Sequence, residues 1–521
     1  MKSFLKITGI TIAIALIFQT LVNFDIIKIG KNEIDYEALQ KIIKDDSGAE
    51  VTGAFEEEPE LPGLEYEDVN LKKGDAYLDQ GMESLALNEY VESVKQKEDN
   101  PEAFTKIGKI HFENKEIAKA RENFVKAIQL NPNYLEARIY LGRSYLMENN
   151  FDKAREIFGN ITAENQLAKY YRGLITSFYG EHETAKGLFA EAIAIGTNEE
   201  TTEKAKVVLK AYEEFARNQG GQDMHLKTLL CRAYNQVEEY NMAVPILFEI
   251  LKEQKDYRDA WIILGYSYLN TGKTKDSIYA FETAKTLDPQ KAETLYFLGL
   301  AHFAQNELQE AIQNIEQAVE NGFEPRIQAN QKLAEIYLLN NQFDKAAEQY
   351  EQIIEVSDTD VNSYIRPVWL YIDKLKNTTR AIELAKRSVE HHPDKAMSYN
   401  LLGWAYVASD NFDEGKTNLL KAIETDPELD AAYLNLGWLY EKKGLLTLAK
   451  RNYEKAKELG GTSSAANLAQ ERYNKIIEAE KEMTQTFQAD LISPDTSAPD
   501  TSGESKVGQK FLLPKITKKQ Q

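Results

Sequence analysis

Residues 258–289 read RDAWIILGYSYLNTGKTKDSIYAFETAKTLDP. Apolar residues recur three and four positions apart on both sides of Thr271-Gly272, which is the spacing of an amphipathic helix. Glycine beside a polar residue marks a turn between the two apolar segments. We therefore predict two short helices joined at Gly272. A chain that repeats such a unit is expected to serve as an interaction scaffold.

The same pattern recurs elsewhere in the chain. Residues 101–132 read PEAFTKIGKIHFENKEIAKARENFVKAIQLNP, and residues 396–427 read AMSYNLLGWAYVASDNFDEGKTNLLKAIETDP. All three stretches have an aromatic residue at position 4, Leu or Ile at position 7, Gly at position 8 and Pro at position 32. A period of about 34 residues is typical of stacked helix-turn-helix repeats. The chain resembles the tetratricopeptide repeat family, whose pattern is W-x2-L-G-x2-Y, then A-x3-F, then P.

Glycine in the middle of each first helix costs about 1 kcal/mol relative to alanine. We interpret this as a requirement for close approach between two helices, because glycine places no side chain between them. The glycines in question are Gly108, Gly142, Gly173, Gly265, Gly299, Gly403 and Gly437. Alanines of the second helix are expected to serve the same approach, with Phe or Tyr one turn later filling the gap. The resemblance implies an all-α fold, a right-handed α-solenoid of about eleven helix-turn-helix units.

Departures from the repeat pattern define the expected domains. We predict a transmembrane anchor or uncleaved signal at 1–24, a juxtamembrane helix and acidic linker at 25–66, a first repeat block at 67–195, an irregular helix and joint at 196–223, a second repeat block at 224–460, a capping helix at 461–487 and a disordered tail at 488–521. Gly220-Gly221 indicates that the joint is flexible. Trp369 takes the glycine position of its unit, so that unit is expected to pack more loosely or to rotate.

An apolar segment precedes the repeats. Residues 7–24 read ITGITIAIALIFQTLVNF, eighteen uncharged residues between Lys6 and Asp25. This length is near the lower limit for a membrane-spanning helix. We expect a single-pass anchor, with a cleaved signal or a buried helix as the alternatives. Lys2 and Lys6 favour an inside N-terminus, which would place the repeats outside the cytoplasm.

Composition narrows the class of partner. The 521 residues carry a net charge of −21, which argues against nucleic acid and favours basic proteins or peptides. Cys231 is the single cysteine, so neither a disulfide nor a cysteine-based zinc site can form within the chain. Gly272-Lys273-Thr274 lacks the upstream glycine of a phosphate-binding loop, since Ser267 stands there. We expect no enzyme, no cofactor and no metal.

The resemblance also implies a binding surface. In tetratricopeptide proteins the first helix of each unit lines a concave groove through its positions 2, 5, 9 and 12. Carried over to this chain, the candidate partner-binding residues are Lys109, Arg143, Tyr266, Tyr296, Phe303, Arg366, Asn400, Trp404 and Trp438. Trp404 and Trp438 lie 34 residues apart and occupy the same position in successive units. They either stack on an extended peptide or pack against the neighbouring first helix.

These observations predict a non-enzymatic, membrane-anchored scaffold that binds protein or peptide partners through the groove. The alternative is an accessory subunit of polysaccharide or envelope-polymer synthesis or export, in which the groove contacts a glycan or a synthase. The last residues, KFLLPKITKKQQ, form a basic and apolar patch that is either inert or a docking tag.

Overall fold

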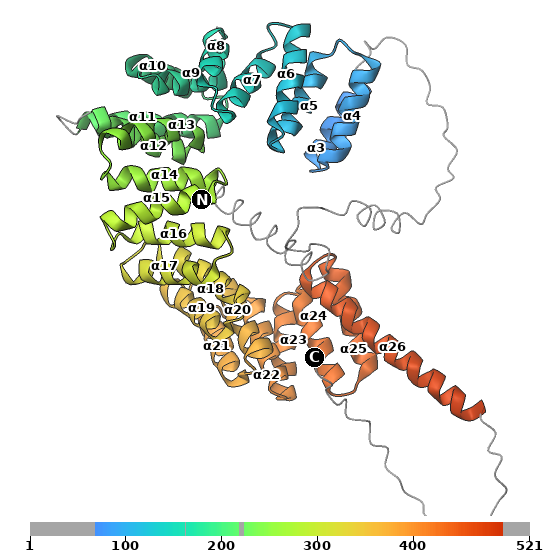
Figure 1. Ribbon diagram of the computed structural model, residues 1–521. Coiled ribbons are helices and arrows are strands. Elements are labelled where there is room, and N and C mark those ends of the chain that lie inside the picture. Colours follow the sequence, from blue (N-terminus) through green and yellow to red (C-terminus); the bar gives the residue numbers. More distant parts are fainter. Residues whose placement is uncertain (1–67, 162, 218–222, 493–521) are drawn as a thin grey trace, which may run out of the picture. The chain divides into compact units, whose positions relative to one another are not determined.

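The computed structural model describes residues 68–161, 163–217 and 223–492 (Figure 1). These ranges hold 24 α-helices, α3 to α26, and no strand. Twenty-one of the α-helices, together with an irregular element after α19, form eleven antiparallel pairs, which we number as units 1 to 11 in chain order. Each helix packs on the next along the chain, so the apolar face of one unit is covered by its neighbour.

The bounds of the units follow. Units 1 to 4 are α3 (Val69–Asp79) with α4 (Glu83–Gln96), α5 (Pro101–Glu113) with α6 (Ile117–Leu130), α7 (Leu135–Met147) with α8 (Phe151–Gly159), and α9 (Gln166–Phe178) with α10 (His182–Ile195). Units 5 to 8 are α12 (Asp223–Gln236) with α13 (Tyr240–Glu253), α14 (Arg258–Asn270) with α15 (Thr274–Leu287), α16 (Ala292–Ala304) with α17 (Leu308–Glu320), and α18 (Arg326–Leu339) with α19 (Phe343–Val356). Unit 9 ends with α21 (Thr378–His391), and units 10 and 11 are α22 (Ala396–Ala408) with α23 (Phe412–Thr425) and α24 (Asp430–Lys442) with α25 (Leu446–Gly460).

In most units the glycine of the first helix lies against a ring of the second helix, whereas Gly299 and Gly403 lie against Ile315 and Leu419. A Cβ atom on Gly108 would lie 2.5 Å from Phe124 Cε1, and one on Gly142 would lie 2.5 Å from Phe158 Cζ. Both rings are fully buried. Close approach is therefore the reason for glycine, as expected, and its partner is the aromatic ring rather than the alanines.

The turn inside unit 6 explains the Gly-Lys-Thr tripeptide. Gly272 has φ +74°, a left-handed conformation that glycine adopts without steric cost. Lys273 is the N-cap residue of α15, and Thr274 is the first residue of that helix. The tripeptide is thus a helix-to-helix turn.

Unit 9 departs from the regular pattern. Its first helix consists of a 3-10 turn η1 (Val361–Tyr364), α20 (Ile365–Trp369) and a π-helical turn η2 (Leu370–Lys374). Trp369 takes the glycine position, and Ala385 takes the position of the aromatic residue sixteen residues later. A large residue on the first helix is thus matched by a small one on the second. The irregularity expected at Trp369 takes the form of a wider helical turn.

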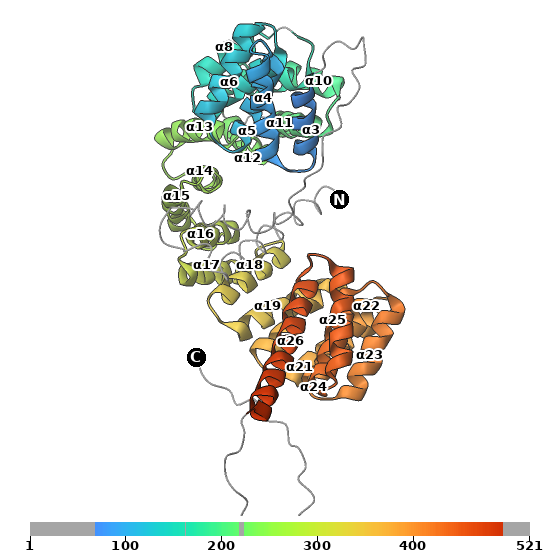
Figure 2. The ribbon, with the colours of Figure 1, turned by 90° about the vertical axis from the view of Figure 1, so that its right-hand side faces the viewer.

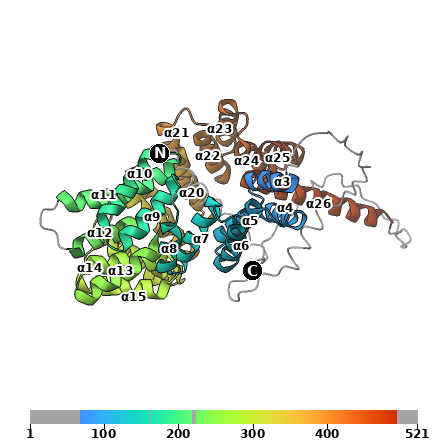
Figure 3. The same ribbon diagram turned by 90° about the horizontal axis from the view of Figure 1, so that it is seen from above.

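Helix α11 (Glu199–Arg217) occupies the region where an irregular helix was expected, and it packs against α10 and α12 (Figure 3). Hydrogen-bonded hydroxyl groups connect α11 to α9 and α12. Ser177 Oγ lies 2.6 Å from Tyr212 OH and accepts from Tyr234 OH at 2.9 Å. One hydrophobic core continues past α11, from Ile139 to Ala280. The division into two blocks stays a prediction, and residues 218–222 of the expected joint lie outside the described residues.

Helix α26 (Ser464–Ile492) packs on α24 and α25 and extends beyond them (Figure 2). Ala466, Ala469 and Ile476 are its buried side chains, so it covers the last apolar face of the array. It continues past 488, where the tail was expected to begin. Residues 493–521 lie outside the described residues.

The expected transmembrane helix requires a correction. In the ranges that the structure describes, no helix is both long enough and apolar enough to cross a membrane. The fold that the structure supports is therefore an all-α repeat solenoid without a membrane-spanning helix in those ranges, and the single-pass, membrane-anchored location is not supported. Residues 1–24 and 25–66, on which that prediction rested, lie outside the described residues.

Candidate partner-binding surface

The first helices of units 9 to 11 and the start of α26 line one hollow of about 320 Å³, which we call the Trp cleft. Its lining residues are Ile365, Trp369, Asp373, Met397, Asn400, Leu401, Trp404, Ala431, Leu434, Asn435, Trp438, Ser464, Ala465, Leu468 and Arg472. Three of the four tryptophans of the chain are among them. Asp373 and Arg472 are the two charged residues of a lining that is otherwise mostly apolar.

The three tryptophans are half-buried, so each is packed on one side and reaches solvent on the other. Trp438 has two cations near its ring, with Lys442 Nζ 5.0 Å and the Arg472 guanidinium carbon 5.6 Å from the ring centroid. Glu441 pairs with Arg472 at 3.2 Å and holds it near the ring. These contacts fix the orientation of the indole and leave the cleft open.

Two buried amides connect the first helices of units 10 and 11. Asn435 Nδ2 donates to Asn400 Oδ1 at 2.9 Å, and Asn400 Nδ2 lies 3.5 Å from Met397 Sδ. Asn400 is only 2% exposed. It lines the cleft, and its amide is already engaged within the chain.

A second hollow, of about 480 Å³, lies over α12, α14 and α16. Tyr266 lines it and meets Phe297 edge to face, with ring centroids 5.1 Å apart. Its charged residues largely pair with one another, through the ion pairs Arg258–Asp259, Arg258–Asp288 and Lys291–Glu293. Arg232 also lines this hollow and makes no ion pair within the described ranges. The hollow is thus nearly neutral, and its lining has five charged residues where that of the Trp cleft has two.

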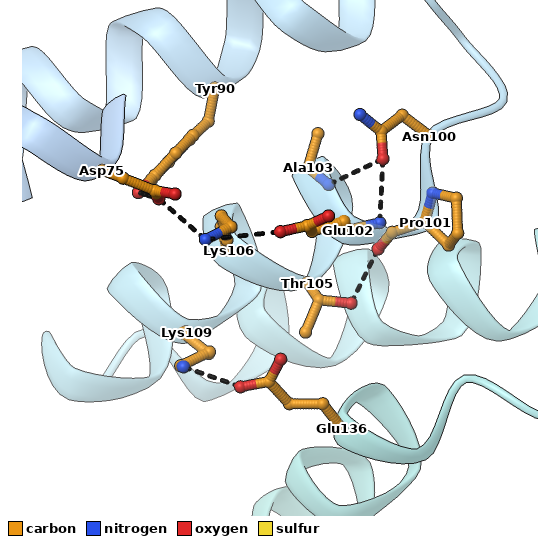
Figure 4. A network of polar contacts seen from close by, with 10 residues as sticks. All are labelled: Asp75, Tyr90, Asn100, Pro101, Glu102, Ala103, Thr105, Lys106, Lys109 and Glu136. Carbon is orange, nitrogen blue, oxygen red and sulfur yellow. Dashed lines mark hydrogen bonds and ion pairs between the residues drawn. The ribbon is translucent and has the colours of Figure 1, made fainter. Parts of the chain in front are cut away.

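Close to the start of the array, intrachain carboxylates neutralise the lysines (Figure 4). Lys109 Nζ donates to Glu136 Oε1 at 2.8 Å. Burial disfavours the charged form of Lys109, but the hydrogen bond to Glu136 and the nearby Tyr140, Glu136 and Glu113 together outweigh it and raise the pKa of the ammonium. Lys106 lies between Asp75, at 2.7 Å, and Glu102, at 3.5 Å. A ligand carboxylate would have to displace these internal partners.

Arg143 occupies an aromatic cage on α7. Its guanidinium carbon lies 4.8 Å from the ring centroid of Phe112, 4.7 Å from that of Tyr140 and 5.4 Å from that of Tyr171. Stacking on several rings restricts the side chain strongly and shields it from water. The cation thus faces the concave side from a fixed position.

The turn between α12 and α13 reaches this cage, and α13 contacts α7. Asn241 Nδ2 donates to the Met147 carbonyl at 3.0 Å, and the Tyr171 hydroxyl hydrogen-bonds to the Glu239 carboxylate. Burial raises the pKa of Glu239, and the nearby charge of Arg143 opposes this rise without cancelling it. We call Arg143, Met147, Tyr171, Glu239 and Asn241 the clasp. It fills the position in which a partner of Arg143 would bind.

The remaining predicted residues lie apart from the cleft. Tyr296 is 1% exposed and stacks on Phe323 with centroids 4.1 Å apart, so it supports the wall of the array from inside. Burial raises its pKa to about 12. Phe303 is half-buried, with Lys332 Nζ 4.9 Å from its ring centroid. Arg366 is exposed on α20, next in sequence to a residue of the Trp cleft.

The structure brings Asn400, Trp404 and Trp438 together and leaves the other six candidates elsewhere. Sequence reasoning missed Trp369 and Arg472. A signal existed for Trp369, since a tryptophan in a glycine position requires an explanation. For Arg472 there was none, because the family register ends with unit 11 and assigns no groove position to a capping helix.

Sites for chemistry are few. Among the described residues, no group of three or more His, Cys, Asp or Glu side chains could hold a metal ion. The Asp358 carboxylate lies 2.5 Å from His391 Nδ1 and 3.2 Å from His392 Nε2. These contacts connect the start of unit 9 to its end. Burial raises the pKa of Cys231 far above its ordinary value, so this thiol is a poor nucleophile.

Comparison with known proteins supports the repeats. One family model described as tetratricopeptide repeat matches residues 111–177, and a second matches residues 264–325, 296–360 and 400–463. The protein CTR9 homolog of Arabidopsis thaliana is 24% identical over 208 residues, which are 37% of this chain and 17% of that protein. The chain therefore aligns with a small part of that relative.

Solved structures of similar helical arrays include the APC/C hetero-tetramer Cut9-Hcn1, at 13% identity, TM-score 0.27, 79% of this chain and 96% of that chain. Yeast Tom70 has 14% identity and TM-score 0.27 over 80% of this chain and 96% of its own. MamA has 24% identity and TM-score 0.30 over 33% of this chain and 93% of its own. At scores of this size, the likeness supports no inference about partner or activity.

The matched segments cover units on both sides of α11, and their helices pair and pack as the repeat pattern requires. Residues 111–177, 264–360 and 400–463 of the chain thus match tetratricopeptide repeats.

Proposed function

We propose that this chain is a non-enzymatic scaffold that holds a protein partner by inserting an apolar side chain of an extended peptide into the Trp cleft. The observation that carries the proposal is the gathering of three half-buried tryptophans, from three successive units, in one open and largely apolar hollow. Large aromatic side chains in a pocket dominate many interfaces, because they bury much area at low entropic cost.

The charge of the cleft and of the chain indicates which residues a peptide ligand should carry. Asp373 is exposed at the cleft and makes no ion pair within the described ranges, and the whole chain has a net charge of −21. A basic residue beside the apolar anchor would meet favourable potential there and be steered toward the site. The preferred ligand is therefore a short segment with one or two large apolar residues and flanking Lys or Arg.

The test is selection of ligands from a random peptide library with the full chain, followed by affinity measurements on the selected peptide. Trp404→Ala should weaken binding about 30-fold, which corresponds to about 2 kcal/mol for an anchor in a pocket. Trp261→Ala is the matched control, because Trp261 lies outside the cleft and its ring meets Tyr279 at 6.0 Å. Its affinity should match that of the unchanged chain.

Equal losses with Trp404→Ala and Trp261→Ala would contradict the proposal, since they would indicate general destabilisation. No observation in the structure favours a glycan ligand. If a glycan array showed binding that depends on Trp404 while no peptide bound, the protein-scaffold function of this cleft would be overturned.

A further inference from the structure

The Trp cleft has an uncovered edge formed by α26, the last helix that the structure describes. Leu468 of α26 lines it and is 42% exposed, so it extends the apolar surface of the cleft to solvent. Asp373, across the lining, is also exposed. The cleft thus presents an apolar floor, an apolar edge and one free carboxylate, and it has no occupant within the described ranges.

One segment outside the described residues has matching chemistry. Residues 510–515 read KFLLPK, in which Phe511, Leu512, Leu513 and Pro514 stand between two lysines. Residues 493–521 contain five lysines and three acidic residues, and all the lysines follow the last acidic residue. This end of the chain is therefore basic and apolar, whereas the chain as a whole is strongly acidic.

The segment can reach the cleft from its own chain. Arg472 lines the cleft, and α26 ends twenty residues later at Ile492, so the helix carries the chain about 30 Å along its axis. Residues 493–510 can span about 60 Å when extended. The return path is thus about twice as long as the distance to be covered.

We infer that residues 510–515 of the chain bind in its own Trp cleft, with the Phe-Leu-Leu-Pro side chains against the indoles and a flanking lysine near Asp373. The inference rests on the proposed function, because it uses the same cleft and the same ligand chemistry. Aromatic rings and proline stack well on indole faces, and a tethered ligand has an effective concentration on the order of 1 mM. The segment therefore competes with any external peptide and lowers its apparent affinity.

The first experiment asks where the segment lies in the full chain. A photo-reactive benzoylphenylalanine replaces Phe511, and cross-linked peptides are identified by mass spectrometry. We expect cross-links to the regions around Trp404, Trp438 and Leu468 at low protein concentration. Cross-links that form only at high concentration would show that a second copy supplies the segment, and they would overturn binding within one chain.

The second experiment measures competition. The double variant Phe511→Ser, Leu512→Ser should bind the library-selected peptide about tenfold more tightly than the unchanged chain. Val507→Ser, an apolar change outside the segment, serves as the control and should leave the affinity unchanged. A synthetic peptide of residues 506–521 should compete with the library-selected peptide for binding to the double variant. This competition should disappear when Trp404→Ala is added to the double variant.

The outcomes separate the two claims. If the external peptide binds through Trp404 while the double variant and the synthetic peptide change nothing, the internal ligand is disproved and the proposed function stands. If neither the external nor the synthetic peptide depends on Trp404, both claims fail.

Discussion

Units 2 to 4 and units 9 to 11 use the same repeat geometry but differ in what fills their concave side. In units 2 to 4, Arg143 is caged by three rings and the α12–α13 turn brings Glu239 to it, 96 residues away in sequence. In units 9 to 11, three tryptophans line a cleft that has no occupant in the described ranges. The difference shows that the repeat alone does not create a binding site. The element that follows the units decides whether their concave side is closed or open.

The neighbouring helices account for this difference. Between units 4 and 5 the chain adds the unpaired helix α11, and the following α13 contacts α7 two units back. After unit 11 the chain adds α26, whose first turns extend the lining of the cleft instead of covering it. An added helix closes one concave surface and lengthens the other.

The largest effect is expected from a substitution in units 2 to 4, where the concave side is closed. Arg143→Met should lower the free energy of unfolding by about 3 kcal/mol, because it removes the stacking of the cation on three rings and the positive charge that opposes the burial penalty of Glu239. Arg472→Met in the open region is the matched control. It should cost less than about 1 kcal/mol, because Arg472 and Glu441 form a pair accessible to water. Denaturation by urea, followed by circular dichroism, measures both variants.

The reactivity of Cys231 shows whether the destabilisation by Arg143→Met opens the region around the clasp. Cys231 is fully buried on α12, next to the turn that forms the clasp, and its thiol should react with a maleimide only when this region opens. Arg143→Met should accelerate the reaction, and Arg472→Met should not. Equal rates in the two variants would contradict the view that the clasp closes units 2 to 4.

The next largest effect is expected at the glycines of the first helices, and it tests whether the two regions pack their helix pairs in the same way. Gly142→Ala and Gly403→Ala should each destabilise the protein by about 2 kcal/mol, because the new Cβ would lie 2.5 Å from Phe158 and 2.6 Å from Leu419. Gly187→Ala, on an exposed helical position with no atom within 4 Å, should instead stabilise the protein by about 0.5–1 kcal/mol. A large difference between the first two variants, measured by thermal unfolding, would show that the regions differ in their cores as well as in their concave surfaces.

The smallest effect concerns pH. Burial raises the pKa of Glu239 above its ordinary value of 4.5, so folding favours the protonated side chain. This contribution is fully present below pH 4.5 and is lost as the pH rises through the folded-state pKa. The stability advantage of Glu239→Gln over the unchanged chain should therefore grow from pH 4.5 toward neutrality. Urea titrations at several pH values measure it, and a difference that shrinks as the pH rises would contradict burial as the dominant cause.

Much of this protein was readable from its sequence. The spacing of Gly108 and Phe124, and of their equivalents, sets the contact between the two helices of a unit, because residues so close in sequence can only meet in one way once both helices form. Trp404 and Trp438 were predicted to lie together for the same reason, since a fixed period places equivalent residues side by side. The eleven units and their turns follow from such local rules.

Tertiary structure decided the rest. The contacts of Asn241 with Met147 and of Glu239 with Tyr171 depend on the stacking of the units between them and on the insertion of α11, and no local sequence pattern encodes that arrangement. The Trp cleft likewise depends on the wider turn at Trp369 and on the position of α26, which has no counterpart in the repeat. The sequence determined a stack of helix pairs, because the contacts within and between pairs are short-range. Which part of its concave surface stays open was decided only by long-range packing.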